Sequence, residues 1–451
     1  MSPTLRSIAV LGFWLACPEP IWGQIVPPPP PFQSPVTLEQ LLEAALANNR
    51  TLKIAEAQVA KAQADARAAS KRQFPEFETQ LFEGPMSSFD FMFRAGVFGT
   101  FPTTGPIPPA DTNVHNPSKI ATLFQFQASQ PLTQLWRIKA NVHQLEYERD
   151  VMEERRRARA QSVSSDVRRQ YYAVLEAQSA VIASDASVSY YKELYRVARE
   201  QQDAKTAFEA DTLAVQAELA RRQSVGTTLR NQLATLKQQL GITAGREIDA
   251  ELPFAPIDGV SQMQVDLASA HARAAKQRPE LREAQLKVQQ SQQGVAAKRY
   301  ERIPDVSLTT RFIGLNNIEV LPPTVAAVGL QMTWNFFDWG RKGSEIFASE
   351  RVRTQAEISL VETQAQVRLD VDVRYRQLLE ARELIGVAEL ARKAADQRLR
   401  LTRARFDAQS ALRSDLLQAE ASRADAERDY RRAVLASLTA EADLQRAIGE
   451  M

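Results

Sequence analysis

The sequence has 451 residues and a nearly balanced charge, with 56 lysine and arginine residues against 54 aspartate and glutamate residues and a formal net charge of +2. This length is enough for two or three ordinary domains, and the balanced charge argues against a nucleic-acid partner. The histidines His115, His143 and His271 lie far apart, and the sequence has no nucleotide-binding glycine loop or nucleophile elbow. These features argue against an enzyme, and we expect neither a cofactor nor a bound metal.

The N-terminus carries one short apolar run, residues 8–16, which follows Arg6 and contains no charged side chain. It is too short to span a bilayer as a helix and is typical of a signal peptide. We place this signal peptide at residues 1–23. Cleavage after Gly23 would remove Cys17, the only cysteine of the sequence, so the exported chain would form no disulfide.

An alternative for this region is lipidation of Cys17, because Leu15-Ala16-Cys17 partly fits a lipidation site. Trp14 stands where such a site has an aliphatic residue, so cleavage is the preferred interpretation. Residues 24–36 then form a proline-rich N-terminal segment, in which Pro27–Pro31 is a stiff spacer rather than part of a core.

An internal duplication follows this segment. When the sequence is shifted by 229 residues, Pro75 falls on Pro304, and at an offset of 204 residues Tyr171 falls on Tyr375. Matches at fixed offsets indicate repeated structural units. The two offsets differ by 25 residues, so the first copy carries extra residues between its matched stretches.

The two repeats are expected at residues 37–240 and 265–451, with residues 241–264 between them. Each contains long stretches without proline, which are free to be helical. The proline-free stretches are residues 37–74, 132–252 and 324–451. A helix from about Thr133 to Gln202 would be about 105 Å long at ~1.5 Å per residue, which no ordinary globular domain needs.

Each long helix has a single apolar seam with the spacing of a coiled coil. The seam positions are Val163, Val167, Tyr171 and Val174 in the first repeat and Val367, Val371, Tyr375 and Leu378 in the second. The remaining faces are rich in arginine, glutamate, glutamine and alanine, which is typical of a solvated surface. We therefore expect helical hairpins at about residues 133–240 and 341–448.

Between the helices the apolar period changes from about 3.6 to 2. In residues 326–336, apolar side chains such as Val328 and Leu330 alternate with smaller or polar ones such as Gly329 and Gln331. Four strands of this kind are predicted at about residues 76–83, 119–131, 304–318 and 324–337. Each repeat therefore has the order helix, strand, strand, long helix, helix.

The apolar faces of these strands need a partner, because the long helices already use their apolar seams in coiled-coil packing. A sheet packed on helices is the soluble alternative. In an exported protein, alternating strands indicate an outer-membrane barrel, and Trp334, Phe336, Phe337 and Trp339 resemble an aromatic girdle at one rim. One chain cannot close a barrel of about eight strands or more, so several copies are needed. Two copies would give a small filled barrel and three a twelve-stranded barrel with room for a lumen, and the strands alone do not decide between the two.

The extra residues of the first repeat fall between its two strands, at about residues 84–118, in a segment rich in glycine, proline and phenylalanine. In a barrel with short turns at one end and long loops at the other, this loop would face the outside. Packing against neighbouring loops is the preferred role, with gating or phage binding as the alternative. Phe89, Phe91 and Phe93 alternate, so they would instead extend the preceding strand if the loop begins later.

These features resemble the TolC family of outer-membrane efflux proteins across residues 36–451. The motifs that carry the resemblance are Val36-Thr37-Leu38, Val265-Asp266-Leu267, Pro75, Pro304, Gln130-Pro131-Leu132, Asn335-Phe336-Phe337-Asp338-Trp339-Gly340, Tyr171-Tyr172-Ala173-Val174-Leu175-Glu176-Ala177 and Asp415-Leu416-Leu417-Gln418-Ala419. The resemblance implies a mixed α/β membrane protein that forms a homotrimer. Its twelve-stranded β-barrel, with four strands from each chain, would continue into an α-helical coiled-coil tunnel across the periplasm. Residues 241–264 would then be an equatorial connector between the two repeats.

The resemblance also places candidate functional residues at the hairpin ends, where the family closes its tunnel. Asp415 matches the selectivity position, at which one carboxylate per chain would form a ring that attracts cations, and Gln418 stands at the second acidic position. Asp211 matches an acid that latches the closed state, but its usual tyrosine and arginine partners correspond to Phe406 and Ala411. For both aspartates the alternative is a solvated carboxylate favoured by the helix dipole.

Arg413 lies two residues beyond the missing arginine partner and is the candidate substitute. The family has a glycine at each hairpin turn, and Lys205 and Gln409 stand at these positions here. Together with Thr206 and Ser410, these residues are the predicted tips that dock a periplasmic adaptor.

The predicted function is a passive outer-membrane exit duct of a tripartite efflux or type I secretion system. Its partners would be a periplasmic adaptor (membrane fusion) protein, an inner-membrane transporter of RND, ABC or MFS type and the lipid of the outer membrane. One alternative is a periplasmic coiled-coil adaptor, although adaptors carry one hairpin and the duplication argues against it. A structural scaffold protein is the other alternative.

Overall fold

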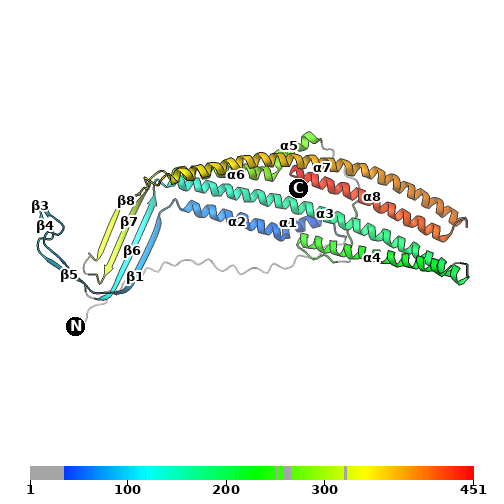
Figure 1. Ribbon diagram of the computed structural model, residues 1–451, viewed down its shortest axis with the longest axis horizontal. Helices are drawn as coiled ribbons and strands as arrows, with labels where there is room; N and C mark the ends of the chain where they lie inside the picture. Colours follow the sequence, from blue (N-terminus) through cyan, green and yellow to red (C-terminus); the bar gives the residue numbers. More distant parts are fainter. Residues whose placement is uncertain are drawn as a thin grey trace.

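The computed structural model describes residues 35–116, 118–206, 208–249, 252–257, 266–318 and 322–450. The predicted signal peptide, Cys17 and almost all of the proline-rich segment lie outside the described residues, as does much of the predicted connector. The described chain is elongated, with strands at one end and long helices that run away from them (Figure 1).

Each repeat begins with two short helices separated by a break. In the first repeat these are α1 (Leu38–Asn48) and α2 (Arg50–Lys71). The side chain of Thr37 accepts from the backbone N–H of Gln40, and the Gln40 side chain accepts from that of Thr37, so α1 begins with a capping box. Asn49 lies in the break and caps α2 by accepting from Thr51 and Leu52. The sequence predicts a single helix before the strands of each repeat, so the break is a difference from that expectation.

The second repeat has the same break, but a different local sequence produces it. Its short helices are α5 (Leu267–Gln277) and α6 (Pro279–Tyr300), and Arg278 lies between them with extended backbone. A residue before proline is biased away from helical geometry, and proline itself suits the first position of a helix. The break is therefore a shared property of the repeats rather than an accident of one sequence.

The four predicted strands form one antiparallel sheet in the order β1-β6-β7-β8. The strands are β1 (Glu76–Met86), β6 (Lys119–Pro131), β7 (Asp305–Asn316) and β8 (Thr324–Thr333). Phe126 lies opposite Thr79 and Phe312, and Leu308 lies opposite Leu330. Opposed residues point to the same face, so the register gathers the apolar sets of all four strands on one face and the polar sets on the other.

Strand β8 ends earlier than the sequence predicted. Its last ladder residue, Thr333, pairs with Asp305, and the next position on β7 would be Pro304. Proline has no N–H to continue the ladder, so the predicted strand at 324–337 stops four residues short. The aromatic residues Trp334, Phe336, Phe337 and Trp339 are therefore in irregular backbone at the end of the sheet, where they are 52–89% exposed.

The long segment between β1 and β6 contains regular structure of its own. Strand β2 (Phe89–Phe93) pairs with β5 (Thr112–Asn116), and β3 (Thr100–Phe101) pairs with β4 (Gly105–Pro106). These ribbons project beyond the four-stranded sheet (Figure 1). Phe89, Phe91 and Phe93 thus belong to a separate ribbon and do not extend β1. Strand β1 ends at Met86, three residues beyond its predicted end.

The remaining helices form two long hairpins. The first consists of α3 (Leu135–Asp203) and α4 (Glu209–Ala244), and the second of α7 (Arg341–Asp407) and α8 (Arg413–Ile448). Near the sheet, α3 packs between α2 and α6; farther away it packs between α4 and α8, with α7 completing the outer edge (Figure 1). The described helices therefore form a single curved layer.

Two hydrophobic clusters hold this layer together midway along its length. One contains Val163, Val167 and Val174 of α3, and the other contains Val367, Val371 and Leu378 of α7. These are the predicted seam residues, and all six are at most 6% exposed. The seams are confirmed as the core of each hairpin. Helix α4 extends to Ala244, so the hairpin exceeds its predicted end at 240.

Candidate functional site: the ends of the helical hairpins

Both hairpins reverse direction through the same backbone geometry. Lys205 and Gln409, which correspond at the repeat offset, have positive φ angles of 58° and 56°. The backbone N–H groups of Thr206 and Ser410 donate to carbonyls five residues earlier, at 2.9 and 2.8 Å. The turns therefore keep the left-handed conformation without glycine, although it costs a side chain about 1–2 kcal/mol.

Each hairpin end exposes polar residues together with one large apolar side chain. Lys205, Thr206, Gln409 and Ser410, predicted to dock an adaptor, are all exposed. Phe208 and Leu412 precede α4 and α8 and are 81% and 68% exposed. A helix start normally has a polar capping side chain, so these exposed apolar side chains do not serve to cap the helices. They are available to another protein surface.

The two predicted acidic residues lie in the first turns of the return helices, Asp211 in α4 and Asp415 in α8. Both are exposed. The Oδ2 atom of Asp415 accepts from the backbone N–H of Leu412 at 3.1 Å, which satisfies one of the free N–H groups at the helix start. Asp415 thus stabilises α8 and still presents an exposed carboxylate.

The structure gives Arg413 a different partner within the chain from the predicted one. Its Nε lies 3.8 Å from Oε1 of Glu193 in α3. Asp211 belongs to α4, which packs against α3 and α1, and no ion pair of Asp211 occurs among the described residues. Because α3 lies between α4 and α8 (Figure 1), the pairing of Arg413 with Asp211 stays a prediction.

Glu193 is a buried carboxylate that the sequence analysis missed, with only 7% of the residue exposed. Arg196, one turn farther along α3, donates from Nη2 to Oε1 at 2.7 Å and from Nε to Oε2 at 2.9 Å. These hydrogen bonds are the main reason that the pKa of Glu193 is lowered, and the charges of Arg196 and Arg413 add to the effect. Glu193 is therefore an anion held between two arginines.

A second α3 residue, Tyr190, lies within electrostatic reach of α8. Its pKa is raised mainly because it is partly buried, then by neighbouring Tyr191 and by the negative charge of Asp415. Tyr190 and Glu193 thus face Asp415 and Arg413 across the α3–α8 contact. One signal for this contact was present in the sequence: Arg413 begins a helix, where a positive charge opposes the helix dipole.

The other two predicted residues do not join this cluster through any contact in the described chain. Phe406 lies half-buried in the last turn of α7, where its carbonyl accepts from the N–H of Gln409 at 2.9 Å. Gln418 is exposed on α8 about one turn beyond Asp415. A site that includes all the predicted residues would need further copies of the chain.

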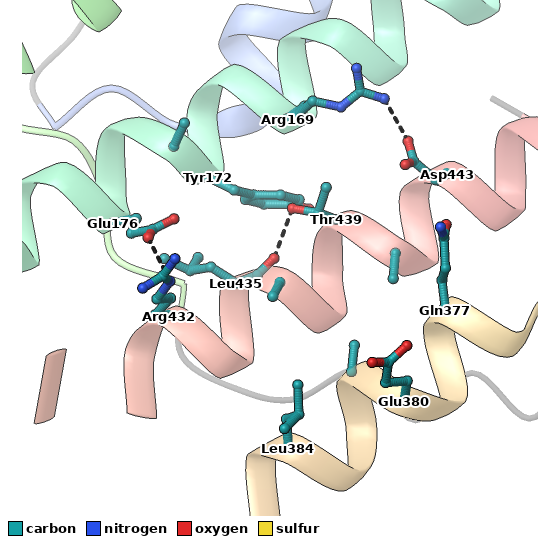
Figure 2. A pocket seen from close by; sticks show the side chains of 14 residues that line it. Arg169, Tyr172, Glu176, Gln377, Glu380, Leu384, Arg432, Leu435, Thr439 and Asp443 are labelled. Atoms are coloured by element: carbon teal, nitrogen blue, oxygen red, sulfur yellow. Dashed lines mark hydrogen bonds and ion pairs between the residues drawn. The ribbon is translucent and has the colours of Figure 1, made fainter. Parts of the chain in front are cut away.

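A separate cleft of about 530 Å³ lies midway along the hairpins, between α3, α7 and α8 (Figure 2). Arg169 donates to Asp443 at 2.8 Å on one side of Tyr172, and Arg432 lies 3.1 Å from Glu176 on the other. Both pairs cross from α3 to α8. The residues around the cleft therefore serve to align two helices, and they include no nucleophile with an adjacent base.

Neither a metal-binding cluster nor a helix able to cross a membrane occurs among the described residues. Within the described ranges, no three histidine, cysteine or acidic residues come together in a way that could hold a metal ion. None of the helices described is both long enough and apolar enough to cross a membrane.

Comparison with known families gave a match over most of the chain. The profile of a family described as outer membrane efflux protein matches residues 41–246 and 271–450. These ranges contain every seam, turn and acidic residue described above. Comparison with curated protein sequences gave no significant match.

Several solved structures share the fold over almost the whole chain. The Campylobacter jejuni CmeC outer membrane channel has a TM-score of 0.74 at 16% identity, covering 91% of this chain and 85% of that one. The Vibrio cholerae outer membrane protein VceC has a TM-score of 0.70 at 16% identity, with 92% and 96% covered. The open state of the Neisseria gonorrhoeae MtrE outer membrane channel has a TM-score of 0.70 at 17% identity, with 92% and 89% covered.

Proposed function

This chain belongs to the outer membrane efflux protein family, and from that membership we propose that three copies assemble into one exit duct. The protein works in efflux at the outer membrane, and its long helices extend into the periplasm. The proposal concerns how copies join, how the duct is closed and which proteins it meets.

The proposed assembly rests on the unpaired edges and the exposed apolar face of the sheet. Its edge strands, β1 and β8, have no outer neighbour among the described residues, and Val328, Leu330 and Met332 on its apolar face are 65–71% exposed. In lipid, every backbone N–H and C=O must be paired within protein. Pairing β1 of one copy with β8 of the next would satisfy both edges and turn the apolar faces toward lipid.

The helical layer supports the same closure. At the α7 edge, Val361, Leu369 and Leu390 are 60–69% exposed, and at the opposite edge Ile54 of α2 and Ile242 of α4 are 59% and 78% exposed. Apolar side chains on both edges of an otherwise polar layer favour an interface with another protein surface. We assign that surface to the next copy, so that three layers enclose a tunnel.

The hairpin ends would close this tunnel far from the membrane. One Asp415 from each copy would form a ring of carboxylates, which attracts cations and repels anions. Phe208 and Leu412, with the predicted docking residues beside them, would meet a periplasmic adaptor. We propose that the duct itself is passive, with energy supplied by an inner-membrane transporter.

The direct test reconstitutes the purified full chain in planar lipid bilayers and measures single-channel conductance and cation selectivity. Asp415→Ala should weaken both cation selectivity and block by divalent cations, because the carboxylate ring is removed. Asp65→Ala provides the control, since it removes an exposed α2 carboxylate far from the hairpin ends. Its selectivity should remain that of the unmodified chain.

Two outcomes would contradict the proposal. Channels whose selectivity is the same with and without the Asp415 carboxylate would remove the gate assignment but leave the duct. A chain recovered only in soluble periplasmic fractions, and forming no channel, would exclude the duct and favour the scaffold alternative.

A further inference from the structure

We propose that Glu193 is a positioning residue of the gate: it holds the first turn of α8, and with it Asp415, against α3 of the same chain. This inference rests on the proposed duct function. It adds to the family assignment an ion pair between Arg413 and Glu193, which links the two hairpins of one chain. This ion pair is separate from the two predicted acidic residues, Asp211 and Asp415.

The first argument is the location of Arg413. It is the first residue of α8, where the partial positive charge of the helix dipole disfavours a cation. The residue that corresponds to it in the first repeat is Glu209, which begins α4 and suits the dipole. A cation at this position of the second hairpin therefore needs a nearby anion, and Glu193 is the carboxylate that lies there.

The second argument is the burial of Glu193. The Glu193 side chain is only 8% exposed, and a buried charge is tolerated only when it is paired and hydrogen-bonded. Arg196 satisfies both oxygens, and Oε1 also lies 3.8 Å from Arg413. Arg196 thus orients the carboxylate on α3, while the same oxygen faces the positive start of α8.

The third argument comes from the duplication. The seam between α3 and α8 has a pseudo-equivalent, in which α7 of one copy would face α4 of the next. There Glu193 corresponds to Gln397 and Arg413 to Glu209, so these two positions cannot form an ion pair with each other. The Glu193–Arg413 link therefore fastens the two hairpins within each chain, and its two positions form no such pair between chains.

These observations together give Asp415 a fixed position relative to α3. Arg413 and Asp415 lie in the same turn of α8, and Asp415 is within the electrostatic reach of Tyr190 on the neighbouring turn of α3. Loss of the Glu193 charge would leave Arg413 at a positive helix start without an anion. The first turn of α8 would then separate from α3, and the carboxylate ring would widen.

The test measures single-channel conductance of the full chain with Glu193→Gln, Arg413→Gln and both changes together. Each single change should raise the mean conductance of the closed-state channel by roughly 1.4- to fivefold, the range that an exposed ion pair supports. Cation selectivity should fall in parallel. The double variant should match the singles, because either change already breaks the same link.

A matched control is Glu420→Gln. Glu420 lies 3.9 Å from Arg403, so this Arg–Glu pair has a similar length, but it joins α7 to α8 within one hairpin. Its removal should leave conductance unchanged. Helix content by circular dichroism and trimer mass would show whether any variant has simply failed to fold.

A second measurement separates positioning from general packing. Cys17 is the only cysteine, so a Cys17→Ser background carrying Glu193→Cys and Arg413→Cys can be joined by a short thiol-to-thiol linker. Linking should return conductance and selectivity to their original values although the charges are gone. A role in packing alone would not be rescued in this way.

The outcomes distinguish this inference from the proposed function. If the unmodified chain conducts and Asp415→Ala alters its selectivity, but the Glu193 and Arg413 changes have no effect or add independently, only the positioning role is excluded. If the linked variant stays leaky, it is also excluded. If the unmodified chain forms no channel, the proposed function fails first.

Discussion

Tyr171 and Tyr375 occupy the same seam position in the two repeats, but their surroundings differ. Tyr171 is 1% exposed, and its hydroxyl donates to the carbonyls of Ala255 at 2.7 Å and Val36 at 3.2 Å. Tyr375 is half-buried, and its hydroxyl has no hydrogen bond in the part of the chain that is described. The same residue is thus fastened in one repeat and only packed in the other.

The difference arises from the chain segments that pack against each seam. In the first repeat, Val36 forms a parallel bridge with Phe254, and both residues join the hydrophobic cluster around Tyr171. The cluster of the second repeat consists of helix residues alone. Helix seams therefore follow from the repeated sequence, whereas the additional contacts of the first repeat come from chain segments outside the hairpin.

Other features are the same in both repeats. Gly245 and Gly449 end α4 and α8 with φ angles of +69° and +89°, and a Cβ on either would lie 2.7 Å from the backbone of Asn48 or Gln277. These contacts place the C-terminal ends of α4 and α8 directly against the C-terminal ends of α1 and α5. Three experiments can now separate what the repeats share from what distinguishes them.

The largest effect is expected for Gly245→Ala and Gly449→Ala. Each forces a side chain into left-handed backbone and against a neighbouring backbone atom, so the free energy of unfolding should fall by about 2–4 kcal/mol. Thermal unfolding followed by circular dichroism measures this, with Gly386→Ala as control. Gly386 lies within α7 with open space around it, and its change should stabilise by up to ~1 kcal/mol. Clearly unequal losses of unfolding free energy at Gly245 and Gly449 would show that the two helix ends are not equivalent.

An intermediate effect is expected from Tyr171→Phe. Burial raises the pKa of Tyr171 to about 12, so its hydroxyl remains a donor at neutral pH, and removing it leaves two carbonyls without this partner. The loss should be about 1–2 kcal/mol. Tyr375→Phe should cost less than about 0.5 kcal/mol, because its hydroxyl has no partner in the described chain. Equal losses would show that the connector contacts contribute nothing.

The smallest effect is a pH dependence confined to the first hairpin. Hydrogen bonds from Arg196 lower the pKa of Glu193 below its ordinary value of 4.5. Its contribution to stability is therefore present in full above that value and is lost as the pH falls through the lower, folded-state pKa. The difference in unfolding midpoint between the unmodified chain and Glu193→Gln should stay constant from about pH 7 to pH 5 and shrink below pH 4.

Gln397→Ala is the corresponding change in the second repeat. Glutamine does not titrate, so any difference that this variant shows should be independent of pH across the same interval. A pH-dependent difference at Gln397, or none at Glu193, would contradict the asymmetry between the hairpin ends.

The sequence by itself predicted the features that depend on local periodicity. A period of two assigned the residues of all four strands to an apolar or a polar face, and the register of the sheet agrees at pairs such as Leu308 and Leu330. Proline-free stretches and the seam at Val167 and Val371 predicted the long helices. The family resemblance is confirmed by the match over residues 41–246 and 271–450.

Element ends were predicted less well, because they depend on neighbours. Asn49 ends one helix and caps the next by bonds that only the folded turn provides. Strand β8 ends where its partner reaches Pro304, and the ribbon of β2 and β5 forms because two parts of a long loop pair with each other. None of these limits is encoded in a repeating pattern of one segment.

The sequence therefore determined the duplicated units, the faces of the strands and the core of each hairpin, because these follow from spacing along one chain segment. The partners of individual charges were decided only by tertiary structure. Arg413 was predicted only as a substitute for the missing arginine partner of Asp211, and its neighbour Glu193 belongs to a helix of the other repeat. The two meet because α3 packs against α8, and this packing depends on the arrangement of the whole helical layer.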